Sequence, residues 1–255
     1  MKNIYPNIYQ NSPKNLNKAK NFLKKNMIIA VPTETVYGLA GNAYSYNAIK
    51  KIYSLKKRPK KNPLIIHYDN LKKLKKDAYI NDDFLKLYKK FCPGPLTFIL
   101  KKRKDSKISS LANANLNTLA VRFPGHRIAK KLLKKLSFPL AMPSANMSSA
   151  LSPINALDVI DEFGKNINFI IDGGKSKIGL ESTVINLVKD IRITRPGAIN
   201  KKDLSKVLGK KISTIKKVSK IYSPGMLKKH YSPGIPIALN CKTAGNKDAF
   251  IVFGK

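Results

Sequence analysis

The sequence predicts a mixed α/β fold (α/β or α+β class) in which one mixed sheet packs under helices. Short, continuous apolar runs alternate along the chain with longer stretches whose apolar residues recur at helical spacing. The chain has 255 residues, 43% of them hydrophobic, which suffices for one substantial core. Strands that alternate with helices favour layers of helix and sheet, although the pattern does not give the strand order.

The first part of the chain predicts a helix, a strand and a second helix. A short helix is expected over Asn15–Lys25, within a polar N-terminal stretch. The apolar run Met27–Val31 predicts a buried strand, because a strand covered on both faces needs no polar alternation. Thr33–Leu39 is interpreted as a strand-to-helix loop. Tyr46–Lys57 is predicted to be the helix, since its apolar residues recur every three to four positions.

The alternation continues as far as Gly209. Leu64–Tyr68 is a second apolar run and predicts another buried strand. Further helices are expected at 82–91, 126–136, 154–163 and 201–208. Further strands are expected at 96–101, 118–122, 138–142, 167–171, 183–188 and 191–194.

The composition changes after Gly209, which predicts a domain over 1–209 and a linker over 210–234. Ser-Pro-Gly occurs twice in the linker, at 223–225 and 232–234, and this density of Pro and Gly excludes a helix or an inner strand. Residues 235–255 contain two short apolar runs, which cannot enclose a core of their own.

Several classes of protein are excluded by composition. No apolar run approaches the roughly 20 residues that span a bilayer, and the N-terminus has no signal-peptide core. Cys92 and Cys241 are too few for a disulfide framework or a zinc cluster, which favours a reducing cytosol. With three histidines, a His-based metal site is not expected either. We therefore expect a cytoplasmic protein.

The formal net charge of +36 has two interpretations that the sequence leaves open. Such an excess ordinarily indicates a nucleic-acid partner. Here the lysines are spread along the chain, and Asn and Ile are abundant as well, so AT-rich coding bias would produce the same charge.

The arginines are few, and half of them lie in turn-forming runs. Arg58 precedes Pro59, Arg122 lies in Val-Arg-Phe-Pro-Gly, and Arg195 lies in Thr-Arg-Pro-Gly. A chain that uses Lys for general charge is expected to retain Arg where a flat, bidentate donor must hold a phosphate or carboxylate. Chance placement beside turns explains the pattern equally well.

Two polar runs in the first part of the chain are candidates for ligand binding. Pro32–Ala40 combines hydroxyls, a carboxylate and a glycine, and it suits a small polar ligand or, more simply, a helix N-cap. Lys57, Arg58 and Asn62 suit a polyphosphate, or else form a solvated basic loop. His67 follows a buried run, so a satisfied histidine at the edge of the core is an equal alternative.

Two later runs are less specific. Pro143–Asn146, followed by several serines, could cap phosphates or a ribose, and a serine-rich turn would look the same. Glu181 and Ser182 precede a β-branched stretch, which alone is an ordinary strand start. Phosphate-loop, dinucleotide-binding, nucleophile-elbow and zinc-protease motifs are all missing. A bound nucleotide would therefore be held by scattered basic and hydroxyl groups.

Taken in order, these runs resemble the Sua5/YrdC family over about residues 14–233. One such motif would be weak, whereas eight in the same order are specific. They are Pro32–Ala40, Lys57–Leu64, Pro93–Thr97, Val121–Gly125, Pro143–Asn146, Leu180–Val184, Arg195–Gly197 and Ser223–Pro233. The resemblance implies a YrdC-like twisted mixed sheet flanked by helices, a C-terminal linker, and in 235–255 a truncated remnant of the Sua5 domain.

The resemblance also implies the activity of an L-threonylcarbamoyladenylate synthase. Such an enzyme joins L-threonine, bicarbonate and ATP, with Mg²⁺, into threonylcarbamoyl-AMP and pyrophosphate. The product serves the tRNA threonylcarbamoyl-transferase complex, which makes N6-threonylcarbamoyladenosine at position 37 of tRNA. The carbamate of threonine attacks the α-phosphate, so the nucleophile belongs to the substrate. No catalytic Ser, Cys or His is implied, and no side chain is implied as a metal ligand.

The family motifs assign roles to individual positions. The residues implied to bind threonine are Thr35, His67, Arg122 and Ser182. The residues implied to bind ATP are Arg58, Asn62, Thr118, Ser144, Ser152, Arg195, His230 and Tyr231. Lys57 and Arg58 are implied to stabilise the developing charge. Met142 stands where a smaller residue is common.

The chain departs from the family pattern in its linker, and two rival functions need weighing. Leu227–Lys229 stands where Lys-Tyr-Arg is common, so linker contacts to phosphate are in doubt, and Ser232 replaces the usual Ala. A non-catalytic module that binds double-stranded RNA or tRNA is the alternative supported by charge, and weak RNA binding is expected in either case. The related carbamoyltransferase domain of hydrogenase maturation is disfavoured, because two isolated cysteines cannot form its zinc site.

Overall fold

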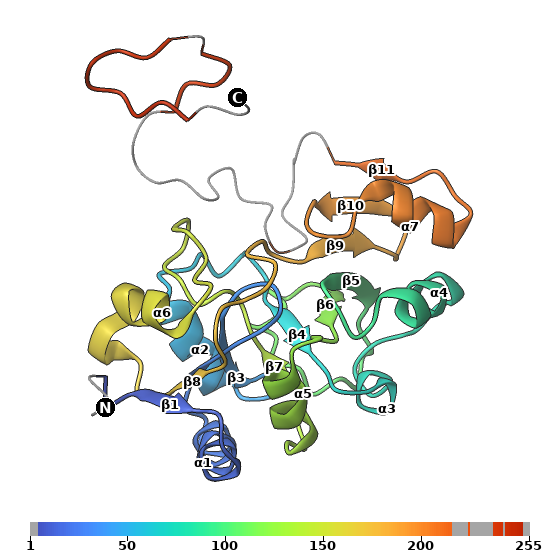
Figure 1. Ribbon diagram of the computed structural model, residues 1–255. Coiled ribbons are helices and arrows are strands. Elements are labelled where there is room, and N and C mark those ends of the chain that lie inside the picture. The colour runs from blue at the N-terminus through green and yellow to red at the C-terminus, as the bar shows by residue number, and fades with distance from the viewer. Residues whose placement is uncertain (1–4, 216–223, 225–236, 242, 252–255) are drawn as a thin grey trace.

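The computed structural model describes residues 5–215, 224, 237–241 and 243–251. It confirms the mixed α/β class (Figure 1). The helices are α1 (Pro13–Lys24), α2 (Tyr46–Leu55), α3 (Leu71–Leu74), α4 (Asp82–Phe91), α5 (Arg127–Lys134), α6 (Ala156–Phe163), η1 (Gly164–Asn166) and α7 (Lys201–Leu208). The strands are β1 (Ile8–Gln10), β2 (Ile29–Val31), β3 (Gly38–Asn42), β4 (Ile65–His67), β5 (Leu96–Lys101), β6 (Thr118–Arg122), β7 (Leu140–Ala141), β8 (Ile170–Asp172), β9 (Thr183–Asn186), β10 (Arg192–Arg195) and β11 (Ser213–Thr214).

The described strands form one mixed sheet of 11 strands in the order β1-β8-β2-β3-β7-β4-β6-β5-β9-β10-β11. At its centre β4 runs parallel to β6, β6 antiparallel to β5, and β5 parallel to β9. The register places His67 opposite Arg122, and Arg122 opposite Thr97. The end of β4, the end of β6 and the start of β9 therefore lie on the same side of the sheet, where these central strands begin or end.

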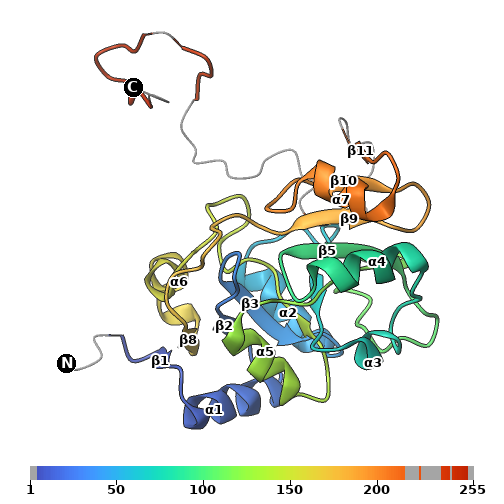
Figure 2. The same cartoon turned by 45° about the vertical axis from the view of Figure 1, so that its right-hand side comes forward.

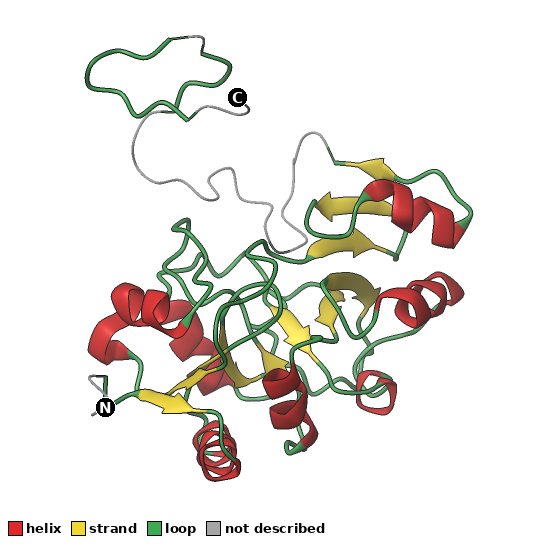
Figure 3. Ribbon diagram, in the orientation of Figure 1, coloured by secondary structure: helices red, strands yellow, loops and turns green. Residues whose placement is uncertain are grey.

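Helices cover both faces of the sheet, so the core has two layers (Figures 2 and 3). Side chains on β2 alternate between them: Ile29 and Val31 pack with α1 and α5, whereas Ala30 belongs to the larger cluster on the other face. That larger cluster includes residues of α2, α4, α6 and α7. Burial on both faces explains why the strand sequences are continuously apolar.

Side-chain oxygens cap the start of six helices. The cap oxygen accepts a hydrogen bond from the backbone N–H three residues later in each case, which satisfies one of the N–H groups that lack a helical partner. The capping residues are Ser12 for α1, Ser45 for α2, Asn70 for α3, Asn81 for α4, Asn155 for α6 and Asn200 for α7.

One expected connection is wrong. Thr33–Leu39 does not lead from a strand to a helix, because Gly38–Asn42 is strand β3 and pairs antiparallel with β2. The sequence Gly-Leu-Ala-Gly-Asn lacks the β-branched and aromatic residues that usually mark a strand. Pairing on both sides, with β2 and β7, overrides that weak propensity.

Four short elements were not expected from the sequence. They are β1 and β11, at the two edges of the sheet, and the helices α3 and η1. Edge strands of two or three residues leave almost no periodic signal. Because β11 pairs with β10, the sheet continues past the domain boundary expected at residue 209.

Most of the expected linker lies outside the described residues. The described part of 235–255 contains no helix or strand, and it exposes Ile237, Leu239 and Ile251. Among the described residues, no helix has the length and apolar character that a membrane crossing would need.

Candidate active site

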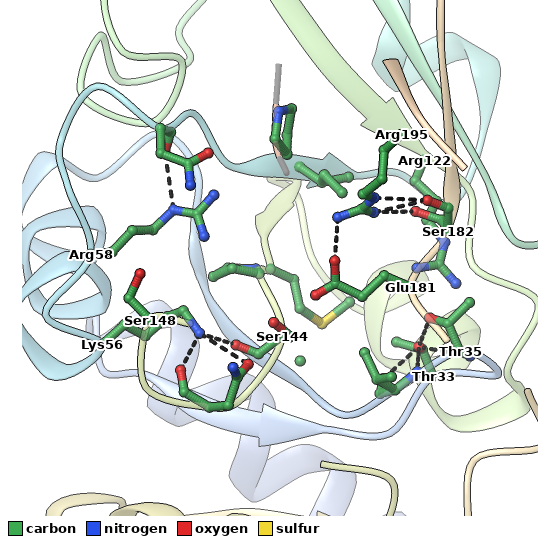
Figure 4. A pocket seen from close by; sticks show the side chains of 18 of the residues that line it. Thr33, Thr35, Lys56, Arg58, Arg122, Ser144, Ser148, Glu181, Ser182 and Arg195 are labelled. Carbon is green, nitrogen blue, oxygen red and sulfur yellow. Dashed lines mark hydrogen bonds and ion pairs between the residues drawn. The ribbon is translucent and has the colours of Figure 1, made fainter. Parts of the chain in front are cut away.

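A polar pocket opens where β4, β6 and β9 meet, and it collects side chains from segments far apart in sequence (Figure 4). His67 ends β4, Arg122 ends β6, and Ser182 immediately precedes β9. The loop after β2 contributes Thr33 and Thr35. The segment after α2, the Ser144–Ala150 loop and Arg195 of β10 complete the walls, and Pro224 also lines the pocket.

The four residues implied to bind threonine all line this pocket. The Thr33 and Thr35 hydroxyls hydrogen-bond at 2.8 Å, so neither residue caps a helix. Ser182 Oγ lies 2.7 Å from Thr97 Oγ1, on the strand beside Arg122. These contacts hold the hydroxyls of Thr33, Thr35 and Ser182 in the same pocket as the Arg122 guanidinium.

Glu34 holds Arg122 in position. Arg122 Nη2 donates to Glu34 Oε1 at 2.8 Å, while the backbone N–H groups of Gly125 and His126 donate to Oε2 at 2.9 and 3.2 Å. Burial would raise the pKa of Glu34, but the Arg122 guanidinium and the Gly125 amide outweigh it, and the pKa lies below its usual value. In the described residues nothing accepts from Arg122 Nη1, which leaves this nitrogen for a ligand carboxylate.

His67 is buried and uncharged near neutral pH. Burial, together with the Arg122 charge, lowers its pKa to about 3. Its Nδ1 lies 3.2 Å from the Ile65 carbonyl oxygen. His67 is therefore a satisfied histidine at the edge of the core that also lines the pocket.

The segment after α2 forms the other half of the pocket. Arg58 Nε donates to the Asn62 carbonyl oxygen at 3.0 Å, and Nη2 donates to that of Pro63 at 2.9 Å. Asn62 is buried, and its Oδ1 has no hydrogen-bond partner among the described residues. An orphaned polar atom in a pocket wall indicates a missing ligand or water.

The lysine that enters the pocket is Lys56, not the expected Lys57. Lys56 is buried and donates to the carbonyl oxygens of Ser144 and Asn146, whereas Lys57 is exposed and its backbone is left-handed, with φ 48°. The sequence did carry a signal, because Lys56 continues the apolar face of α2 after Ile49 and Ile52.

The other expected ATP contacts differ in their placement. Ser144 and Arg195 line the pocket. Ser152 is not among the lining residues, but its hydroxyl donates to the lining residue Glu181 at Oε1, at 3.2 Å. Thr118 is not among the lining residues: it begins β6, two positions before Ala120, which pairs with Ile65 of β4. His230 and Tyr231 lie outside the described residues.

Arg195 joins the two halves of the pocket. Its Nε and Nη2 donate to the Ser182 carbonyl oxygen at 3.0 and 2.9 Å, and Nη2 also reaches Ser182 Oγ at 3.1 Å. Its Nη1 forms an ion pair with Glu181, and both side chains are 11% exposed. Gly197 permits this arrangement, since a Cβ there would lie 2.5 Å from the Glu181 carbonyl oxygen.

Comparison with known proteins identifies the family. The Sua5/YciO/YrdC family model, described as "Telomere recombination", matches residues 21–197. The chain belongs to the Sua5/YciO/YrdC family. The resemblance inferred from the eight motifs is thereby confirmed.

Relatives with curated names resemble most of this Sua5/YciO/YrdC chain. It is 40% identical over 227 residues to a threonylcarbamoyl-AMP synthase of Pyrococcus abyssi, covering 86% of this chain and 66% of the relative. It is 41% identical over 228 residues to the Bacillus subtilis protein of that name, covering 87% of this chain and 65% of the relative. The chain thus spans about two thirds of the length of these relatives.

A solved structure shares the fold. The crystal structure of Pyrococcus abyssi Sua5 complexed with L-threonine matches with a TM-score of 0.83 and 39% identity, covering 89% of this chain and 68% of that one. The YrdC-like mixed sheet flanked by helices is therefore shown for the described residues.

Proposed function

We propose that this chain is an L-threonylcarbamoyladenylate synthase. In this proposal it joins L-threonine, bicarbonate and ATP into threonylcarbamoyl-AMP and pyrophosphate. The product passes to the tRNA threonylcarbamoyl-transferase complex for modification of adenosine 37. The observation that carries the proposal is that one pocket is lined both by Arg122, where the threonine carboxylate would bind, and by Arg58, where the phosphates would bind. The names of the relatives and the threonine complex of one of them support it.

The arrangement suits a reaction whose nucleophile comes from the substrate. Threonine amine and bicarbonate form a carbamate with loss of water. A carbamate oxygen then bonds to the α-phosphorus as the bond to the pyrophosphate oxygen breaks. The protein must hold two anions together and shield their repulsion, which the cationic lining can do. Arg122 would bind the threonine carboxylate through Nη1. His67 is uncharged, so it would not compete with Arg122 for that carboxylate.

The phosphates would meet the cations of the other half of the pocket. Lys56, Arg58 and Arg195 line it, together with Asn62. The described residues contain no group of three or more His, Cys, Asp or Glu side chains that could hold a metal. In this proposal the triphosphate and water carry the Mg²⁺ ion, which would neutralise phosphate charge.

The test is pyrophosphate release from ATP measured with threonine and bicarbonate present or omitted. We expect release to require both, and release indifferent to threonine would refute the proposal. Arg58→Ala and Arg122→Ala should each lower the rate at least about tenfold, or about 1.4 kcal/mol of transition-state stabilisation. The matched control is Arg103→Ala, because Arg103 forms an ion pair with the exposed Asp105 and does not line the pocket. This control should keep the wild-type rate.

A further inference from the structure

Glu181 places a carboxylate in a pocket that is otherwise cationic. Among the described residues that line the pocket, the other Lys, Arg, Asp and Glu side chains are Lys56, Arg58, Arg122 and Arg195, all of them basic. Burial lowers the pKa values of Lys56 and Arg58, and the negative charge of Glu181 opposes that shift. A carboxylate in this position repels phosphates, so binding nucleotide does not by itself explain its presence.

Among the described residues, Glu181 contacts two that are expected to bind ATP. Arg195 Nη1 pairs with Oε2, and Ser152 Oγ donates to Oε1 at 3.2 Å. The carboxylate therefore accepts from donors that a phosphate would otherwise use. Figure 4 shows Glu181 extending toward Arg195.

The geometry of Arg195 leaves little room for a second anion. A guanidinium has five N–H donors. Nε and Nη2 are held by the carbonyl oxygen and hydroxyl of Ser182, which fixes that edge of the group against the backbone. The Nη1 edge remains for a ligand, and Glu181 already occupies it. A phosphate that binds this edge in a bidentate manner must take the place of the carboxylate.

We propose that Glu181 is an internal counter-ion that occupies the phosphate position at Arg195 and Ser152 and gives it up when nucleotide binds. The carboxylate makes every anion compete for these donors. A triphosphate offsets this competition through further contacts to Lys56 and Arg58, whereas a smaller anion cannot reach those side chains as well. Glu181 thus disfavours retention of inorganic phosphate and pyrophosphate and sets the selectivity of the pocket. The nucleotide in this role rests on the proposed function, but the exchange itself needs only an anion.

The experiment compares pyrophosphate binding to three proteins by isothermal titration calorimetry. Glu181→Gln removes the charge and keeps the size of the side chain. Asp190→Asn makes the same change in an exposed ion pair with Arg192 on the same hairpin. We expect Glu181→Gln to bind pyrophosphate at least about fivefold more tightly than wild type, and Asp190→Asn to stay within about twofold. Equal or weaker binding by Glu181→Gln would overturn the inference, because it would show that the carboxylate does not compete.

A structure of the wild-type protein with pyrophosphate provides a readout that does not depend on how the variant folds. We expect a phosphate oxygen on Arg195 Nη1 and the Glu181 carboxylate turned away. An intact ion pair between Glu181 and Arg195 beside the bound anion would overturn the inference. Failure of threonine-dependent pyrophosphate release would instead refute the synthase, and the pyrophosphate titration would still report on Glu181.

Discussion

Lys56 is the residue whose charge depends most directly on its surroundings. Its side chain is 1% exposed, and it donates to two backbone carbonyl oxygens across the pocket. Burial and the neighbouring Arg58 charge lower its pKa to about 7, against a usual value of 10.5. Below that pH the amine is protonated and attracts phosphate, and above it the amine is neutral. The anion affinity of the pocket should therefore change near physiological pH.

A pH series on Lys56→Met tests this dependence. Loss of the Lys56 proton should weaken binding of α,β-methylene-ATP by roughly tenfold between pH 6 and 8, because the protonated fraction of Lys56 falls by about that factor. Lys56→Met should lack this part of the pH dependence in calorimetric titrations, although it retains the part due to the phosphates. Lys57→Met is the matched control, since the neighbouring side chain is exposed, and it should follow the wild-type profile. Parallel profiles for wild type and Lys56→Met would contradict the assigned role.

At the scale of elements, the β9–β10 hairpin is what brings the two halves of the pocket together. The strands pair antiparallel, and a shift of register between Ile193 and Arg195 places Arg195 opposite Val184. The following turn lies against the start of β9, where a Cβ on Gly197 would be 2.5 Å from Thr183 N. Only glycine allows this approach, so the turn fixes Arg195 beside Glu181 and Ser182.

Substitution of two glycines separates this close approach from simple loss of stability. Gly197→Ala should destabilise the protein by about 2 kcal/mol or more, because backbone atoms must move, and it should also reduce pyrophosphate release. Gly209→Ala should cost about 1 kcal/mol, since Gly209 ends α7 with φ 64°, but it should retain activity. Denaturant unfolding and the release assay measure both effects. Full activity in a folded Gly197→Ala protein would show that the turn does not position Arg195.

At the scale of the whole molecule, the sequence predicts the fold well because buried strands are continuous apolar runs. It fails where tertiary pairing overrides weak propensity, as in the glycine-containing β3, and at the short edge strands β1 and β11. Arginines beside turns lead correctly to Arg58, Arg122 and Arg195 in one pocket. The choice between Lys56 and Lys57 depends on which face of α2 is buried. The Glu181–Arg195 ion pair joins the segment before β9 to the end of β10, and one sequence carries no signal for such a pairing.

The net charge of +36 also belongs to this scale. Weak RNA binding, steeply dependent on salt, stays a prediction, and it is compatible with the synthase. The two roles differ in the residues they need. RNA binding by a general basic surface should survive Arg58→Ala and Arg122→Ala, whereas synthesis should not.

A crystal structure with L-threonine and α,β-methylene-ATP bound together would test the central claim most directly. We expect the threonine carboxylate on Arg122 and the phosphates on Arg58, in one continuous cavity. The amine of threonine should then face the α-phosphorus with room for one carboxyl group between them. Threonine and nucleotide in separate cavities would contradict the proposed synthase.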